Sequence, residues 1–95
     1  MTLDDFRFIP DTFEVTAGHP VRLTLTNTDR ITPHNFIIDN EQAGLNINTT
    51  VSAGKSTIIE FTPTTPGSYT FYCSKKLPFM KSHRQKGMEG TLIVK

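Results

Sequence analysis

The sequence predicts an all-β sandwich of about seven to eight strands, formed by a single domain over residues 1–95. Apolar and polar residues alternate in several short segments, with the period of half-buried strands. Gly, Pro and Asn residues interrupt these segments at intervals typical of a small antiparallel sandwich. No segment has a helical period, and 95 residues are close to the size at which one core suffices.

The strand-like segments can be followed along the chain. In residues 21–27 (VRLTLTN), Val21, Leu23 and Leu25 share one face, and the residues between them are polar or charged. The same alternation recurs in two later segments, residues 56–62 and 91–95. Turn-forming residues separate the strands, at residues 17–20, 53–55 and 65–67.

Two further strands carry a side chain that can bind a metal at one of their ends. In HNFIID, His34 shares a face with Phe36 and Ile38, and in GSYTFYC, Cys73 shares a face with two aromatic residues. If the apolar residues face the core, His34 and Cys73 point inward too. We therefore expect them to be able to meet at one end of the sandwich.

The overall composition is that of an ordinary soluble chain. Hydrophobic residues make up 36% and charged residues 20%, and no apolar run approaches the roughly 18 to 20 residues that span a bilayer. The first five residues have neither the basic residues nor the apolar stretch of a secretory signal. We expect a protein that is not embedded in a membrane and is either cytosolic or the mature form of an exported protein.

Positive charge is concentrated near the C-terminus. Residues 1–72 contain four basic and eight acidic residues, whereas residues 74–88 contain five basic and no acidic ones. The five are Lys75, Lys76, Lys81, Arg84 and Lys86. This basic cluster has one aromatic neighbour, Phe79, and no stacking platform, so we do not expect it to bind nucleic acid.

The same segment contains the donor atoms of a metal site. Cys73 is the only cysteine, so it forms no internal disulfide and is a buried filler, a reactive thiol or a metal ligand. Together with His34, His83 and Met88 it offers a thiolate, two imidazoles and a thioether. This set suits copper in both oxidation states, whereas a thioether gives no reason to choose zinc.

Four segments, in this order, resemble the cupredoxins, the type 1 blue-copper proteins. They are FRFIPDTFEVTAGHPVRLTLTNTD, PHNF, PGSYTFYCS and GMEGTLIV, and the resemblance covers nearly the whole chain. It implies a Greek-key sandwich with one copper ion, held in plane by His34, Cys73 and His83 and axially by Met88. It also implies that Asn35 hydrogen-bonds across to Ser74 and ties the two ligand loops together.

The loop after the cysteine departs from the family pattern. Nine residues separate Cys73 from His83, where the family has two to four, while the four residues between His83 and Met88 are ordinary. Met80, within the longer loop, is a second candidate for the axial ligand. His19 lies in a predicted turn and is assigned no role.

The resemblance implies a one-electron carrier located in the periplasm or otherwise outside the cytoplasm. We expect a monomer whose basic cluster docks a redox protein with an acidic face. The alternative is a copper-binding protein for storage, delivery or sensing, in which the long loop and Met80 serve metal entry and exit. An enzyme is not expected, because the catalytic centres of copper enzymes need further histidines and only His19 is spare.

Overall fold

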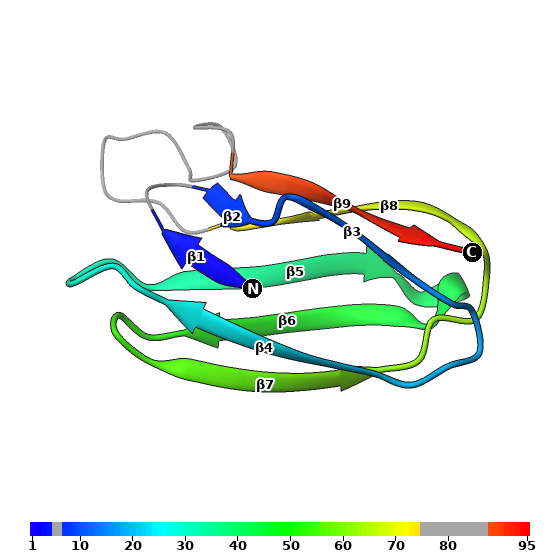
Figure 1. Cartoon of the computed structure of the whole chain (residues 1–95), viewed down its shortest axis with the longest axis horizontal. Coiled ribbons are helices and arrows are strands. Elements are labelled where there is room, and N and C mark those ends of the chain that lie inside the picture. The colour runs from blue at the N-terminus through cyan, green and yellow to red at the C-terminus, as the bar shows by residue number, and fades with distance from the viewer. Residues whose placement is uncertain (5–6, 75–87) are drawn as a thin grey trace.

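The computed structural model describes residues 1–4, 7–74 and 88–95, and it confirms the predicted β-sandwich (Figure 1). The described residues form nine strands and one short 3-10 helix, η1. In chain order they are β1 (Thr2–Asp4), β2 (Arg7–Ile9), β3 (Thr12–Val15), β4 (Val21–Asn27), β5 (His34–Asn40), η1 (Glu41–Ala43), β6 (Leu45–Val51), β7 (Ser56–Phe61), β8 (Gly67–Tyr72) and β9 (Glu89–Val94). No helix in these ranges has the length and apolar character of a membrane span.

The strands form two sheets that pack face to face. One sheet has the order β2-β1-β4-β7 and the other has the order β3-β9-β8-β5-β6. Both sheets are mixed rather than purely antiparallel, because β1 runs parallel to β4 and β3 runs parallel to β9. The N-terminal segment contributes three short strands and changes sheet after β2, which accounts for the count of nine instead of seven or eight.

A cluster of phenylalanine rings fills the core between the sheets. Phe71 of β8 is fully buried, with its ring centroid 5.0 Å from those of Phe8 and Phe36 and 5.7 Å from that of Phe13. A Cβ atom on Gly90 of β9 would lie 2.3 Å from the Asp11 carbonyl oxygen and 2.4 Å from the Phe71 ring. Glycine at that position therefore allows both the ring and the Asp11 backbone to pack against β9.

The strand directions bring three chain segments together at one end of the sandwich. Antiparallel pairing places Tyr72 of β8 opposite both Ile37 of β5 and Glu89 of β9. The start of β5, the end of β8 and the start of β9 therefore share one end, on the left in Figure 1. We call this the ligand end, because all the predicted ligands within the described residues lie there.

Candidate metal centre

Two of the predicted ligands, His34 and Cys73, are brought together at the ligand end. His34 is the first residue of β5, and Cys73 directly follows β8. Both side chains are fully buried, as the alternation in their strands predicts. The Cys73 Sγ atom lies 4.0 Å from the His34 Nδ1 atom.

This separation fits two ligands of a single ion. Metal–sulfur and metal–imidazole bonds of about 2.3 and 2.0 Å, at angles between tetrahedral and somewhat above trigonal, place the two donor atoms roughly 3.5 to 3.9 Å apart. The observed 4.0 Å is close to that span and long for a direct hydrogen bond to nitrogen. The pair can therefore hold an ion with little movement of either strand.

Asn35 connects the two ligand segments through both its backbone and its side chain. Its backbone N–H donates to Cys73 Sγ at 3.3 Å. Its side-chain amide donates to Ser74 Oγ at 2.9 Å and accepts from the Ser74 N–H at 2.8 Å, so the expected contact between Asn35 and Ser74 is present. These three hydrogen bonds orient the sulfur and fix the distance between the two segments.

Met88 lies next to Cys73 at the ligand end. The Cys73 N–H donates to the Met88 carbonyl oxygen at 3.2 Å, immediately before β9 begins. The Met88 side chain is fully buried although Gly87 precedes it and Gly90 follows shortly after. This backbone hydrogen bond holds Met88 beside the Cys73 segment.

The other predicted features fall outside the described residues. His83, Met80 and the basic cluster all belong to residues 75–87. Within the described ranges, no three His, Cys, Asp or Glu side chains gather as a ligand group. The described part of the centre is thus one imidazole, one thiol and the adjacent Met88.

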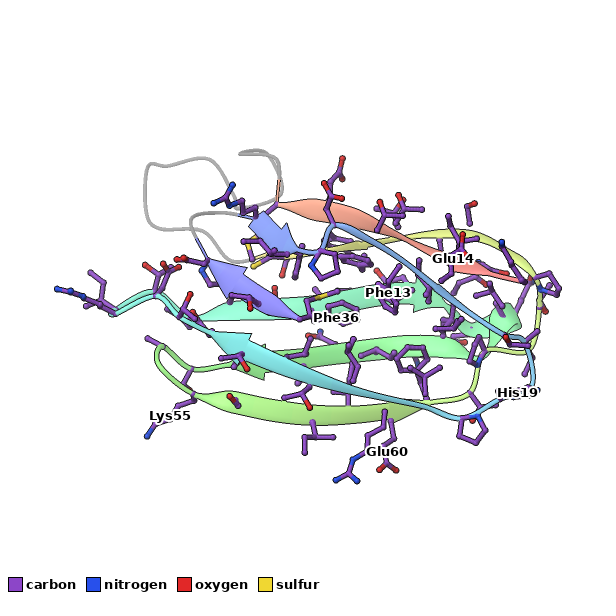
Figure 2. The ribbon with its side chains drawn as sticks, viewed as in Figure 1. Phe13, Glu14, His19, Phe36, Lys55 and Glu60 are labelled. Atoms are coloured by element: carbon purple, nitrogen blue, oxygen red, sulfur yellow. The ribbon has the colours of Figure 1, made fainter. Side chains whose placement is uncertain are left out.

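His19, the histidine to which no role was assigned, is exposed in the turn between β3 and β4. Figure 2 shows it at the end of the sandwich opposite the ligand end. The structure therefore separates it from His34 and Cys73.

A further polar residue, Asp29, contacts the centre without having been predicted from the sequence. Its carboxylate accepts a hydrogen bond from the Nε2 atom of His34, on the side of the ring away from Cys73. Asp29 lies in the loop between β4 and β5, where no strand periodicity indicates the direction of a side chain. The available signal was an acidic residue five positions before a predicted ligand.

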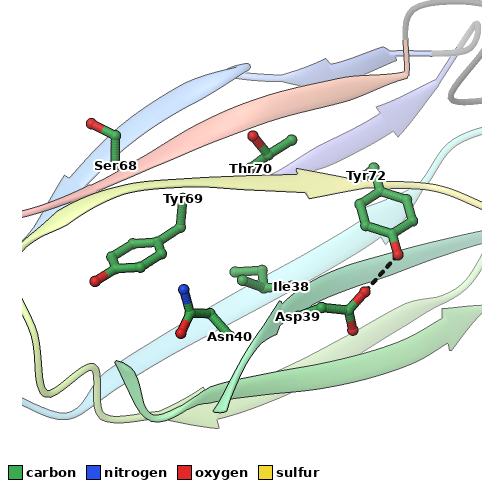
Figure 3. A pocket seen from close by; sticks show the side chains of 7 residues that line it. All are labelled: Ile38, Asp39, Asn40, Ser68, Tyr69, Thr70 and Tyr72. Carbon is green, nitrogen blue, oxygen red and sulfur yellow. Dashed lines mark hydrogen bonds between the residues drawn. The ribbon is translucent and has the colours of Figure 1, made fainter. Parts of the chain in front are cut away.

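A pocket of about 270 Å³ lies between β5 and β8. β5 and β8 share one registered pair, Ile37 with Tyr72, and the pocket opens between the strands beyond that pair (Figure 3). The Tyr72 hydroxyl donates to the Asp39 carboxylate at 2.6 Å at one side of the pocket. Neither His34 nor Cys73 lines this pocket.

Comparison with known proteins gives consistent similarities. Residues 1–94 match the family model described as the cupredoxin-like domain. The chain is 31% identical to a plastocyanin of Dryopteris crassirhizoma, over 96% of this chain and 90% of that protein. Among solved structures, reduced auracyanin from Roseiflexus castenholzii superposes with a TM-score of 0.79 at 24% identity, over 99% of this chain and 93% of the other. A mutant fern plastocyanin, solved in oxidised and reduced forms, has a TM-score of 0.61 at 34% identity, over 96% and 90%.

Proposed function

We propose that this chain, which belongs to the cupredoxin-like family, carries single electrons on a copper ion held by His34, Cys73, His83 and Met88. At the level of the family, the protein is a copper electron carrier that binds one copper ion and is not an enzyme. The proposal adds the ligand set, the docking face and the location.

The observation that carries the proposal is the pairing of His34 Nδ1 with Cys73 Sγ, 4.0 Å apart and both fully buried. A thiolate favours the reduced ion, and an imidazole accepts both oxidation states. The buried thioether of Met88 would supply a weak donor that imposes little geometry on the ion. When bound, copper provides a reversible one-electron couple.

Hydrogen bonds that do not involve the metal link the segments that carry the donor atoms, so they do not depend on the oxidation state of the ion. Asn35 links the His34 segment to the Cys73 segment through three hydrogen bonds. The Cys73 N–H links the same segment to Met88. Because His34, Cys73 and Met88 are buried and linked by these hydrogen bonds, we expect them to rearrange little when the charge of the ion changes.

The proposed docking face is the basic cluster, which is joined to the ligand end at Ser74 and Met88. Its five positive charges without an acidic residue suit a redox protein with an acidic face. Charge would bring such a partner to the same end of the molecule as the ion. We place this exchange in the periplasm or another extracytoplasmic compartment, with the carrier acting as a monomer.

The sequence between Cys73 and His83 is also compatible with an alternative function in copper storage, delivery or sensing. Nine residues separate them and include Met80, a third sulfur donor in this part of the sequence. A long loop with its own thioether would suit a protein that stores, delivers or senses copper by admitting and releasing it. The two functions differ in whether the metal leaves the protein during its cycle.

A spectroscopic titration tests the proposed site. Added Cu(II) should produce one intense charge-transfer band per chain, because a Cys73 thiolate binds the ion. His34→Ala and His83→Ala should each weaken the band, and added imidazole should restore much of it. The matched control is His19→Ala, at the opposite end of the sandwich, which should leave the spectrum unchanged. If His19→Ala weakens the band as much as either variant, the histidine assignment is wrong.

A second measurement distinguishes an electron carrier from a protein that stores or delivers copper. The loaded protein should be reduced and reoxidised repeatedly in voltammetry with no loss of copper. A modest Cu(I) chelator that removes the metal within minutes under native conditions would instead support storage or delivery.

A further inference from the structure

The His34 ring is held by hydrogen bonds on the side facing away from Cys73. The side chain is 0% exposed, so both of its ring nitrogens need partners within the protein. Nδ1 faces the Cys73 sulfur, and Nε2 faces the Asp29 carboxylate. Since a carboxylate can only accept a hydrogen bond, Nε2 carries the proton and donates to Asp29.

Asn27 holds the loop that presents Asp29. This last residue of β4 is 1% exposed, and its side-chain oxygen accepts from the Asp29 N–H at 3.0 Å. Its amide nitrogen donates to the carbonyl oxygens of Thr32, at 2.9 Å, and Val51, at 3.0 Å. One buried side chain therefore ties the start and the end of the loop to the end of β6, and Asp29 approaches the ring from a fixed backbone.

The chemistry of the acceptor matters as well as its position. A neutral carbonyl would suffice to satisfy a buried N–H, but this chain places a carboxylate there, with 23% of its side chain exposed. A carboxylate that accepts from the far nitrogen of an imidazole fixes the ring orientation and makes the other nitrogen a stronger donor to a metal. A stronger nitrogen donor favours the more highly charged ion.

We propose that Asp29 is a positioning residue that orients His34 and lowers the reduction potential of the centre by stabilising Cu(II) relative to Cu(I). This inference rests on the proposed function, in which His34 Nδ1 is a copper ligand. Asp29 would act through the imidazole of His34 and would not itself be a ligand. The three hydrogen bonds of the buried Asn27 side chain hold this arrangement when the ion is absent.

The test compares two variants with a matched control. Asp29→Asn keeps the size and an acceptor oxygen but removes the charge, and Asp29→Ala removes both. The control is Asp11→Asn, which removes the same charge from an exposed position between β2 and β3. Affinities for Cu(I) and Cu(II) and the reduction potential are measured for each protein. In the metal-free proteins, NMR records the Nε2–H signal and the tautomer of His34.

Loss of a hydrogen-bonding partner of a metal-bound histidine costs about 10- to 100-fold in affinity. We expect Asp29→Asn to weaken Cu(II) about tenfold more than Cu(I), which raises the potential by about 60 mV for a one-electron couple. Asp29→Ala should do the same and release copper faster. In the metal-free protein, Asp29→Ala should lose the protected Nε2–H signal and mix the two tautomers, while Asp29→Asn and Asp11→Asn should keep the signal.

Failure of this inference can be distinguished from failure of the proposed function. If wild-type protein binds copper with an intense band and the Asp29 variants shift the potential no more than Asp11→Asn does, the role of Asp29 is refuted and the carrier stands. If wild-type protein forms no such band, the proposed function fails. In that case the NMR comparison still decides whether Asp29 orients His34, and an unchanged signal in Asp29→Ala overturns the orientation.

Discussion

Replacing Asn35 by alanine should measure how strongly the two ligand segments are tied together. The Asn35 side chain is 4% exposed and forms two hydrogen bonds with Ser74, at 2.9 and 2.8 Å. Asn35→Ala removes both bonds and leaves the Ser74 N–H without this acceptor. The bond from the Asn35 backbone N–H to Cys73 Sγ is retained, because it does not involve the side chain.

The expected decrease in the free energy of unfolding follows from these contacts. Each of the two neutral hydrogen bonds contributes about 0.5 to 1.5 kcal/mol to the free energy of unfolding, and because Ser74 is exposed, water can satisfy its N–H in the variant. We expect a total of roughly 1 to 3 kcal/mol. This is a large share of the stability of a 95-residue domain, which is about 5 to 14 kcal/mol at about 0.05 to 0.15 kcal/mol per residue.

Urea denaturation of the metal-free protein, followed by far-ultraviolet circular dichroism in a reducing buffer, gives the free energy of unfolding. Ser74→Ala removes one of the two bonds and should cost about 1 kcal/mol, and the double variant should show a coupling of similar size. The control is Asn46→Ala, whose amide contacts Glu41 at 3.2 Å on the surface and should cost less than about 0.5 kcal/mol. If Asn35→Ala is no more destabilising than Asn46→Ala, the link between the segments does not stabilise the fold as argued.

Four other changes test the site and its surroundings. Cys73→Ser should abolish the charge-transfer band and leave the β-sheet circular dichroism spectrum intact, because the thiolate produces the transition; an unchanged absorption spectrum would refute the cysteine assignment. Met88→Leu should retain copper and raise the reduction potential measured by voltammetry, whereas Met80→Leu should do much less; exchanged results would assign the axial position to Met80. Gly90→Ala should lower the free energy of unfolding by about 1 to 3 kcal/mol, since its Cβ would lie 2.3 Å from the Asp11 carbonyl oxygen and 2.4 Å from the ring of Phe71; a urea midpoint equal to that of wild type would contradict that packing. The last change replaces three residues of the basic cluster together by Glu: Lys76, Lys81 and Arg84. It should slow electron transfer to an acidic partner at low salt, where the Debye length is about 30 Å, without changing the copper spectrum. Equal stopped-flow rates for this variant and wild type would show that the cluster does not steer docking.

Within the β-sheets, much of the arrangement could be predicted from local pattern. Alternation placed His34 and Cys73 on the inner faces of their strands, and both are fully buried. The mixed sheets were not predicted, because the parallel pairing of β3 with β9 joins residues 12–15 to residues 91–94. Alternation describes the two faces of a strand and carries no information about which strand lies beside it.

The amino-acid sequence by itself determined the class of fold, the two strand ends that carry a ligand, and the kinds of donor atom available. Each of these depends on residue type and on a period of two along the chain. Only the tertiary structure decided the 4.0 Å separation of Cys73 Sγ and His34 Nδ1 and the contact between Asp29 and the far side of the His34 ring. The physical reason is that both contacts depend on the pairing of strands and on the path of a loop, which Asn27 holds by hydrogen bonds to residues as distant in sequence as Val51.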